Sequence, residues 1–170
     1  YNQGDMACAM EKIREAIGIW AKALPADHSS LLTARSSLAA LYSRSGELQQ
    51  GEAQLRHVVA ALEASNAAKP SADGVNALSR ARSELTTNLL YQGRAADALV
   101  LSRQRWHELQ ASRNPGETAA NALATLALAE LANGLRQSAL AHARDALQRD
   151  HASAPGSRRE GFALMTMARA

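Results

Sequence analysis

The stretch LYSRSGEL at residues 41–48 closes one helical run with a glycine and starts another directly after it. The same order of residues returns in YNQGDM at 1–6, LLYQGRAADAL at 89–99 and LANGLRQSAL at 131–140. Because glycine adopts the left-handed backbone that ends a helix without steric cost, each copy is typical of a tight helix–turn–helix. The sequence therefore predicts helix hairpins that repeat along the chain.

The spacing of these glycines supports a repeat array. Successive turn glycines are separated by 42, 47 and 41 residues, a spacing found in helical repeats. The four are Gly4, Gly46, Gly93 and Gly134. Five positions after each comes a small residue, namely Ala9, Gly51, Ala98 and Ala139. We expect these positions, Gly51 and Ala98 in particular, to lie where two helices touch.

Apolar residues recur at helical spacing, as Leu31, Leu38 and Leu41 do, and no strand pattern is found. A content of 46% hydrophobic and 4% aromatic residues also favours closely packed helices over a sheet. The predicted helices are at about 5–23, 29–44, 47–64, 74–91, 94–112, 116–132, 135–150 and 157–170. The stretch 68–74 is predicted as the longest break, and NPGE at 114–117 as a capping box.

These patterns resemble the tetratricopeptide repeat (TPR), in the version of about 42 residues found in kinesin light chains and in many bacterial signalling proteins. EAIGIWAKALPADHS at 15–29 and RSSLAALYSRSGEL at 35–48 are similar to that version. Departures occur at Arg105 and Trp106, which replace an Ala-Leu pair, and at Glu130, which replaces an aromatic residue.

The resemblance implies an all-α fold, a right-handed α-solenoid of antiparallel helix pairs. Its units would be a partial repeat at 1–28, repeats at 29–71, 72–115 and 116–155, and a partial repeat at 156–170. In such repeats the first helix of each pair lines a concave groove that binds protein segments. The groove positions carried over are Thr33, Ser36, Ala40, Ser43, Arg80, Ser83, Thr87, Leu90, Asn121, Ala124 and Leu128.

Both ends of the sequence fall inside a repeat, so we expect a fragment of a longer solenoid. Apolar side chains would then be uncovered at one end around Ile13 and Ile17. At the other end they would be those of Phe162, Leu164, Met165 and Met167. Exposed apolar patches favour association, so we expect fragments to associate end to end.

The sequence offers little that points to catalysis, a cofactor or a metal. No phosphate-binding glycine loop or nucleophile elbow is present. The five histidines lack the spacing of a helical zinc site, and we interpret them as turn and surface residues. Cys8 is interpreted as a small packed residue. Trp20 and Trp106 are interpreted as packing residues rather than ligand anchors.

Charge and hydropathy argue against a nucleic acid or a membrane as the partner. The formal charge of +3 comes from 19 basic and 16 acidic residues spread along the chain, unlike the clustered charge of a nucleic-acid binder. RARSE at 80–84 and SRQRWHE at 102–108 could suggest RNA contact, but we interpret both as amphipathic helices with solvated charges. No apolar run of about 18 residues predicts a membrane span, and we expect a cytoplasmic protein.

These observations favour a non-enzymatic binding module that recognises a protein or peptide partner in its groove. The alternative hypothesis is a sensory or regulatory arm of a larger bacterial signalling protein, such as a Ser/Thr kinase or a transcription regulator. RNA binding by a related helical repeat is a third, less favoured hypothesis, because those repeats cluster near 35 residues.

Overall fold

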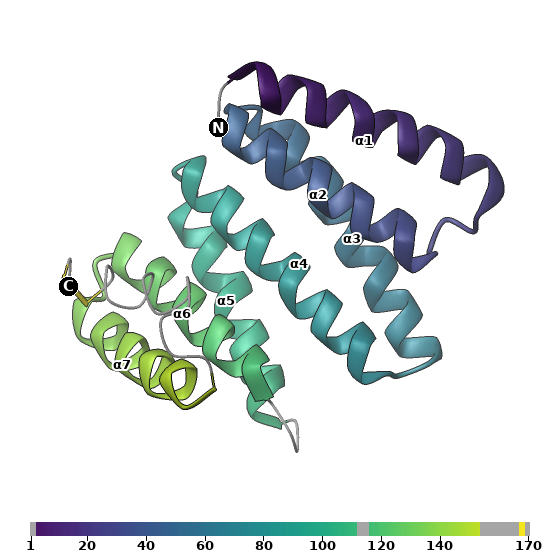
Figure 1. Cartoon of the computed structure of the whole chain (residues 1–170). Helices are drawn as coiled ribbons and strands as arrows, with labels where there is room; N and C mark the ends of the chain where they lie inside the picture. Colours follow the sequence, from purple (N-terminus) through teal and green to yellow (C-terminus); the bar gives the residue numbers. More distant parts are fainter. Residues whose placement is uncertain (1–2, 112–115, 154–166, 169–170) are drawn as a thin grey trace. The chain divides into compact units, whose positions relative to one another are not determined.

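The computed structural model describes residues 3–111, 116–153 and 167–168 (Figure 1). In these ranges the chain is all-α, with sequential helices packed as antiparallel pairs and no strand. The helices are α1 (Gln3–Ala23), α2 (Ser29–Ser45), α3 (Leu48–Ala68), α4 (Ala72–Tyr91), α5 (Ala95–Ala111), α6 (Gly116–Ala132) and α7 (Arg136–Ser153). The chain divides into two compact units, Tyr1–Tyr91 and Gln92–Ala170, which we describe separately.

Three of the four predicted turn glycines are confirmed. Gly46, Gly93 and Gly134 follow α2, α4 and α6, and their φ angles are 88°, 74° and 75°. A side chain would strain this left-handed backbone, so glycine is required where each helix ends. After α6 the amide of Leu135 donates to the carbonyl of Glu130 (2.9 Å) and that of Gly134 to Leu131 (3.0 Å). This pair of bonds is the Schellman motif.

The prediction for Gly4 is wrong, because α1 already begins at Gln3 and Gly4 lies in its first turn. A glycine can close a helix only where a helical run precedes it. Gly4 is itself helical, so it continues α1 and ends no helix.

The predicted long break at 68–74 is also wrong. Helix α3 continues to Ala68 and α4 starts at Ala72, so only residues 69–71 separate them. The hydroxyl of Ser71 accepts from the amide of Gly74 (3.0 Å) and caps α4. The longer glycine spacing here lies in the helices, since α3 has 21 residues and α4 has 20, against 17 in α2 and in α5.

Two sequence predictions concern stretches that lie mostly outside the residues described by the structure. The capping box at 114–117 lies outside the described residues except for Gly116 and Glu117, which begin α6. The helix predicted at 157–170 also lies outside them, apart from the helical residues 167–168.

In the first unit, α1 packs on α2 through a buried cluster of Met10, Leu38 and Tyr42. Ile13 and Ile17 pack against this cluster, so the expectation that they form an uncovered face is wrong. They lie on the side of α1 that meets α2, which supplies the apolar partner. The guanidinium of Arg14 donates to the Tyr42 hydroxyl from Nε (3.1 Å) and Nη2 (2.9 Å), which adds a polar contact across the same helix pair.

The contact between α2 and α3 depends on Gly51, which confirms its predicted position between helices. A Cβ atom at Gly51 would lie 3.1 Å from the Ala39 carbonyl oxygen, 2.9 Å from Ser43 Oγ and 2.8 Å from Asn88 Nδ2. The Asn88 amide donates to Ser43 Oγ (2.7 Å) and to the Leu48 carbonyl (3.1 Å). Gly51 therefore leaves room for a buried asparagine of α4 to connect α2 and the start of α3.

In the second unit, α6 packs between α5 and α7. Ala98 of α5 is fully buried, and so are Ala139 and Ala143 of α7, which lets helices approach closely. A cluster of Leu123, Ala124 and Ala146 is covered by Trp106 and Leu147. This contact confirms the packing interpretation of Trp106, whose ring also lies 6.0 Å from the Arg149 guanidinium.

Polar contacts hold α6 to both neighbours. Arg105 Nη2 of α5 donates to Asn121 Oδ1 of α6 (3.2 Å), and Asn133 Nδ2 donates to the carbonyl of Ala95 at the start of α5 (2.8 Å). Toward α7, the buried carboxylate of Glu130 lies 2.7 Å from Nδ1 of the half-buried His142. Glu130, in place of an aromatic residue, thus forms a polar link between α6 and α7.

A first prediction concerns helix contact at Gly51. Gly51→Ala should lower the free energy of unfolding, because overpacking costs about 1–3 kcal/mol and exceeds the gain in helix preference. Gly18→Ala is the matched control: Gly18 also lies inside a helix, with no atom within 4 Å of an added Cβ. It should raise that free energy by about 0.5–1 kcal/mol. Urea unfolding of both variants measures this, and equal shifts would contradict the close contact.

A second prediction concerns the Glu130–His142 link. His142→Ala should lower the free energy of unfolding by about 1–3 kcal/mol, because it removes the partner of a buried carboxylate. In a Glu130→Gln background the same substitution should cost less, since a neutral amide is easier to bury unpaired. A double-mutant cycle by thermal or urea unfolding measures the difference. Equal costs in the two backgrounds would show that the link contributes nothing.

Candidate functional site

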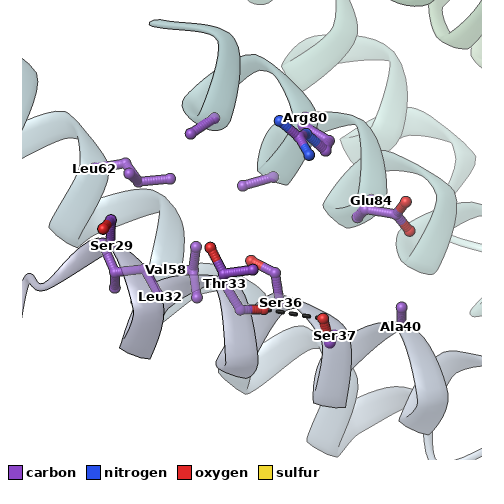
Figure 2. A pocket seen from close by; sticks show the side chains of 12 residues that line it. Ser29, Leu32, Thr33, Ser36, Ser37, Ala40, Val58, Leu62, Arg80 and Glu84 are labelled. Atoms are coloured by element: carbon purple, nitrogen blue, oxygen red, sulfur yellow. Dashed lines mark hydrogen bonds between the residues drawn. The ribbon is translucent and has the colours of Figure 1, made fainter. Parts of the chain in front are cut away.

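A groove in the first unit brings four of the predicted binding residues together. Thr33, Ser36 and Ala40 of α2 and Arg80 of α4 line a cavity of about 260 Å³ (Figure 2). Because α2 and α4 are each antiparallel to α3, they run in the same direction along its two sides. The groove thus lies between the two helices that pack on α3.

Helical spacing explains why these side chains share the groove. On α2 the lining residues recur at three- and four-residue intervals from Ser29 to Ala40, whereas Leu31 and Leu38 on another face are buried. On α4 the lining residues from Ala77 to Glu84 follow the same spacing. One amphipathic pattern therefore supplies both the core and the wall of the groove.

The floor of the groove is apolar at one end. Val58 and Leu62 of α3 line it together with Leu32 of α2 and Ala77 and Ala81 of α4. Figure 2 shows Leu62 near Ser29, at the end of the groove opposite to Ala40. An apolar side chain of a ligand placed at this end would be removed from water.

The walls of the groove are polar. The α2 side carries hydroxyl groups, of which Ser37 Oγ donates to the Thr33 carbonyl (3.0 Å). The α4 side carries Arg80 and Glu84, both exposed. Within the described part of the chain, neither of these two charged groups has an ion pair or a hydrogen bond. They are therefore available to a ligand.

The other predicted groove residues of the first unit lie outside this cavity. Ser43 donates to the Ala39 carbonyl (3.0 Å) and accepts from Asn88, so its hydroxyl belongs to the contact between helices. Ser83 is buried, and its carbonyl accepts from the Thr87 hydroxyl (3.0 Å). Leu90, farther along α4, is half-buried.

The three predicted groove residues of α6 belong to the second unit. Asn121 accepts from Arg105, and its carbonyl accepts from the Thr125 hydroxyl (2.7 Å). Ala124 is part of the buried cluster with Leu123, and Leu128 is half-buried.

Sequence reasoning missed Glu84 and Leu62 among the groove residues. Glu84 lies four residues after Arg80, on the same face of α4, so the helical period could have identified it. Leu62 belongs to a second helix of a pair, and no pattern in its own helix distinguishes a groove floor from a core. Its position follows from how α3 packs under α2 and α4.

Two candidates for catalysis or metal binding, a histidine and the cysteine, lie at a helix cap and on an exposed helix face. His28 caps α2, where Nδ1 accepts from the amide of Ser30 (3.3 Å). Cys8 is exposed, so its interpretation as a packed residue is wrong; it lies on a face of α1 away from the Met10 cluster. Across the described ranges, no three His, Cys, Asp or Glu residues are placed to hold a metal ion.

Trp20 is more exposed than predicted. Its side chain is 37% exposed and lines a second, shallower cavity of about 370 Å³ beside Ser30 and Thr33. The neighbouring Ile19 is 60% exposed. The packing interpretation of Trp20 therefore holds only in part, because the ring lies near the end of α1, where α2 covers it incompletely.

Among the helices in the described ranges, none has the length and apolar content that a bilayer span needs.

Comparison with known proteins supports the fold. No protein-family model and no curated protein matches the sequence. A solved structure from Podosopora anserina, described as a putative kinesin light chain with nearly identical TPR-like repeats, matches with a TM-score of 0.69 at 22% identity. The match covers 98% of this chain and 77% of that chain. A single-substitution form of that protein matches over the same shares with a TM-score of 0.71 at 22% identity. The chain therefore has the fold of TPR-like repeats.

Proposed function

We propose that this chain is a protein–protein interaction module that binds an exposed segment of a partner protein in the groove between α2 and α4. The observation that carries the proposal is the groove itself, in which four predicted binding residues meet over an apolar floor. The TPR-like fold supports it, since such repeats generally serve as interaction modules.

The size and chemistry of the groove fit a protein segment better than a cofactor. Its volume of about 260 Å³ is below the range of about 300–1,000 Å³ typical of small-molecule sites. Hydroxyl groups along α2 can bind the backbone of an extended segment, while Arg80 can hold a carboxylate by a charge-assisted hydrogen bond. We propose no reaction for the chain itself. We propose Leu90 as a further apolar contact on the first unit and Leu128 as a separate apolar contact on the second unit.

Site-specific crosslinking tests this function. A photoreactive amino acid replaces Ser37, an exposed residue in the groove, or Gln49, an exposed residue of α3 outside it. In a lysate of the source organism, the first variant should crosslink a protein that the second does not. Crosslinking of the same proteins at both positions, or of none, would contradict the proposal.

The recovered partner is then titrated against variants of the full chain. Arg80→Glu should weaken the complex by about ten- to hundred-fold, because it replaces a charge-assisted contact of about 1.5–3 kcal/mol with repulsion. Arg103→Glu is the matched control, an exposed arginine of α5 without an ion pair or hydrogen bond in the described residues. Equal weakening by both variants would mean that net charge, and not the groove, drives binding.

A further inference from the structure

We propose that the groove between α2 and α4 selects an extended segment that presents an aliphatic, an acidic and a basic side chain in that order. The order runs from the Leu62 end of the groove to Glu84, with successive side chains two residues apart. This inference rests on the proposed function, that the groove binds protein, and adds the chemistry of the segment.

Three kinds of surface follow one another along α4. Ala77 lines the apolar floor together with Leu62, Arg80 follows about one turn later on α4, and Glu84 lies about one further turn along. Figure 2 shows this order, with Leu62 and Glu84 at opposite ends and Arg80 between them. A segment lying in the groove therefore meets an apolar site, a cation and an anion in sequence.

Within the described residues, the side chains of Arg80 and Glu84 form no ion pair. Several other charged side chains of the first unit do form ion pairs. Arg82 Nη2 lies 2.7 Å from Glu63 Oε1, and Arg56 Nη2 lies 2.7 Å from Glu52 Oε1. Arg80 and Glu84 are placed four residues apart, a spacing that permits a pair, and yet form none. Each can take an opposite charge from a ligand, an acid at Arg80 and a base at Glu84.

The spacing of the two charges matches that of an extended chain. Four residues of a helix rise about 6 Å, so Arg80 and Glu84 project from points about that far apart along α4. In an extended chain, side chains two residues apart lie on the same side and are separated by about 6.5 Å. An extended segment parallel to α4 therefore sets an acid and a base, two residues apart, opposite both charges.

The hydroxyl wall satisfies the backbone of such a segment. The Thr33 and Ser36 hydroxyls line the groove and form no hydrogen bond within the described residues. An extended segment has backbone N–H and C=O groups that need partners when they leave water. Hydroxyl groups both donate and accept, so this wall can bind the backbone in either chain direction.

Short labelled peptides test the inference against the full chain. The probes are fluorescein peptides with the core Leu-Ser-Asp-Ser-Lys and its reverse, Lys-Ser-Asp-Ser-Leu, flanked by Gly-Ser. The controls exchange the two charged residues, which gives Leu-Ser-Lys-Ser-Asp and its reverse. By fluorescence anisotropy, one probe should bind at least about ten-fold more tightly than its control. Binding of probes and controls that differs by less than about three-fold would overturn the inference.

The charge-exchange variant of the protein supplies the reciprocal test. In Arg80→Glu/Glu84→Arg the preference should invert, so that the exchanged peptide binds more tightly than the probe. Both side chains are exposed, and net charge and composition are unchanged, so the variant should melt like the unchanged chain. A preference that stays the same in the variant would show that other residues read the peptide.

These results are separable from those for the proposed function. If a partner crosslinks at Ser37 and is weakened by Arg80→Glu, but no peptide shows the preference, the groove binds protein and the inferred order of side chains is wrong. If the peptides show the inverting preference and no cellular partner is found, the chemistry of the groove stands and the proposed function fails.

Discussion

The close contact at Gly51 is the constraint on which the first unit depends. Here α3 approaches the backbone of α2 so closely that an added Cβ would lie 3.1 Å from the Ala39 carbonyl oxygen. The same opening admits the buried Asn88 of α4, whose amide contacts Ser43 and the first residue of α3. One residue without a side chain thus allows Asn88 to connect three helices by two hydrogen bonds. Interiors this dense have little tolerance for added volume.

The groove is a consequence of that packing. Because α3 lies between α2 and α4, the two outer helices leave a channel whose floor is formed by the α3 side chains Val58 and Leu62. The small side chains of Ala40, Ala77 and Ala81 keep the channel open. Apolar floor and polar walls follow from the amphipathic period of each helix, since residues between the core face and the solvent face line the opening.

Charged residues in this chain serve two purposes that the structure separates. Arg82 is buried and forms an ion pair with Glu63, so its guanidinium has a structural role. Arg80, two residues earlier on the same helix, points to the groove and keeps an exposed charge. Side chains two positions apart point in different directions around a helix. Arg82 therefore has a structural role, whereas Arg80 is a candidate ligand contact.

The sequence by itself determined the fold class and the turns of the helix pairs. Helical periodicity and the left-handed backbone at Gly46, Gly93 and Gly134 are local properties, readable from neighbouring residues. The same local reasoning placed Gly51 between helices. It failed at Gly4, which lies inside the first turn of α1, and at 68–74, where Ser71 caps a longer α4.

Tertiary structure decided which carried-over positions meet in one place. Thr33, Ser36, Ala40 and Arg80 share the groove, whereas the hydroxyl of Ser43 is occupied by Asn88, a residue 45 positions away. Whether a side chain on a helix surface is open or engaged depends on what a distant helix places against it. Leu62 entered the groove for the same reason, because the packing of α3 beneath α2 and α4 brings together residues whose own helices carry no sign of it.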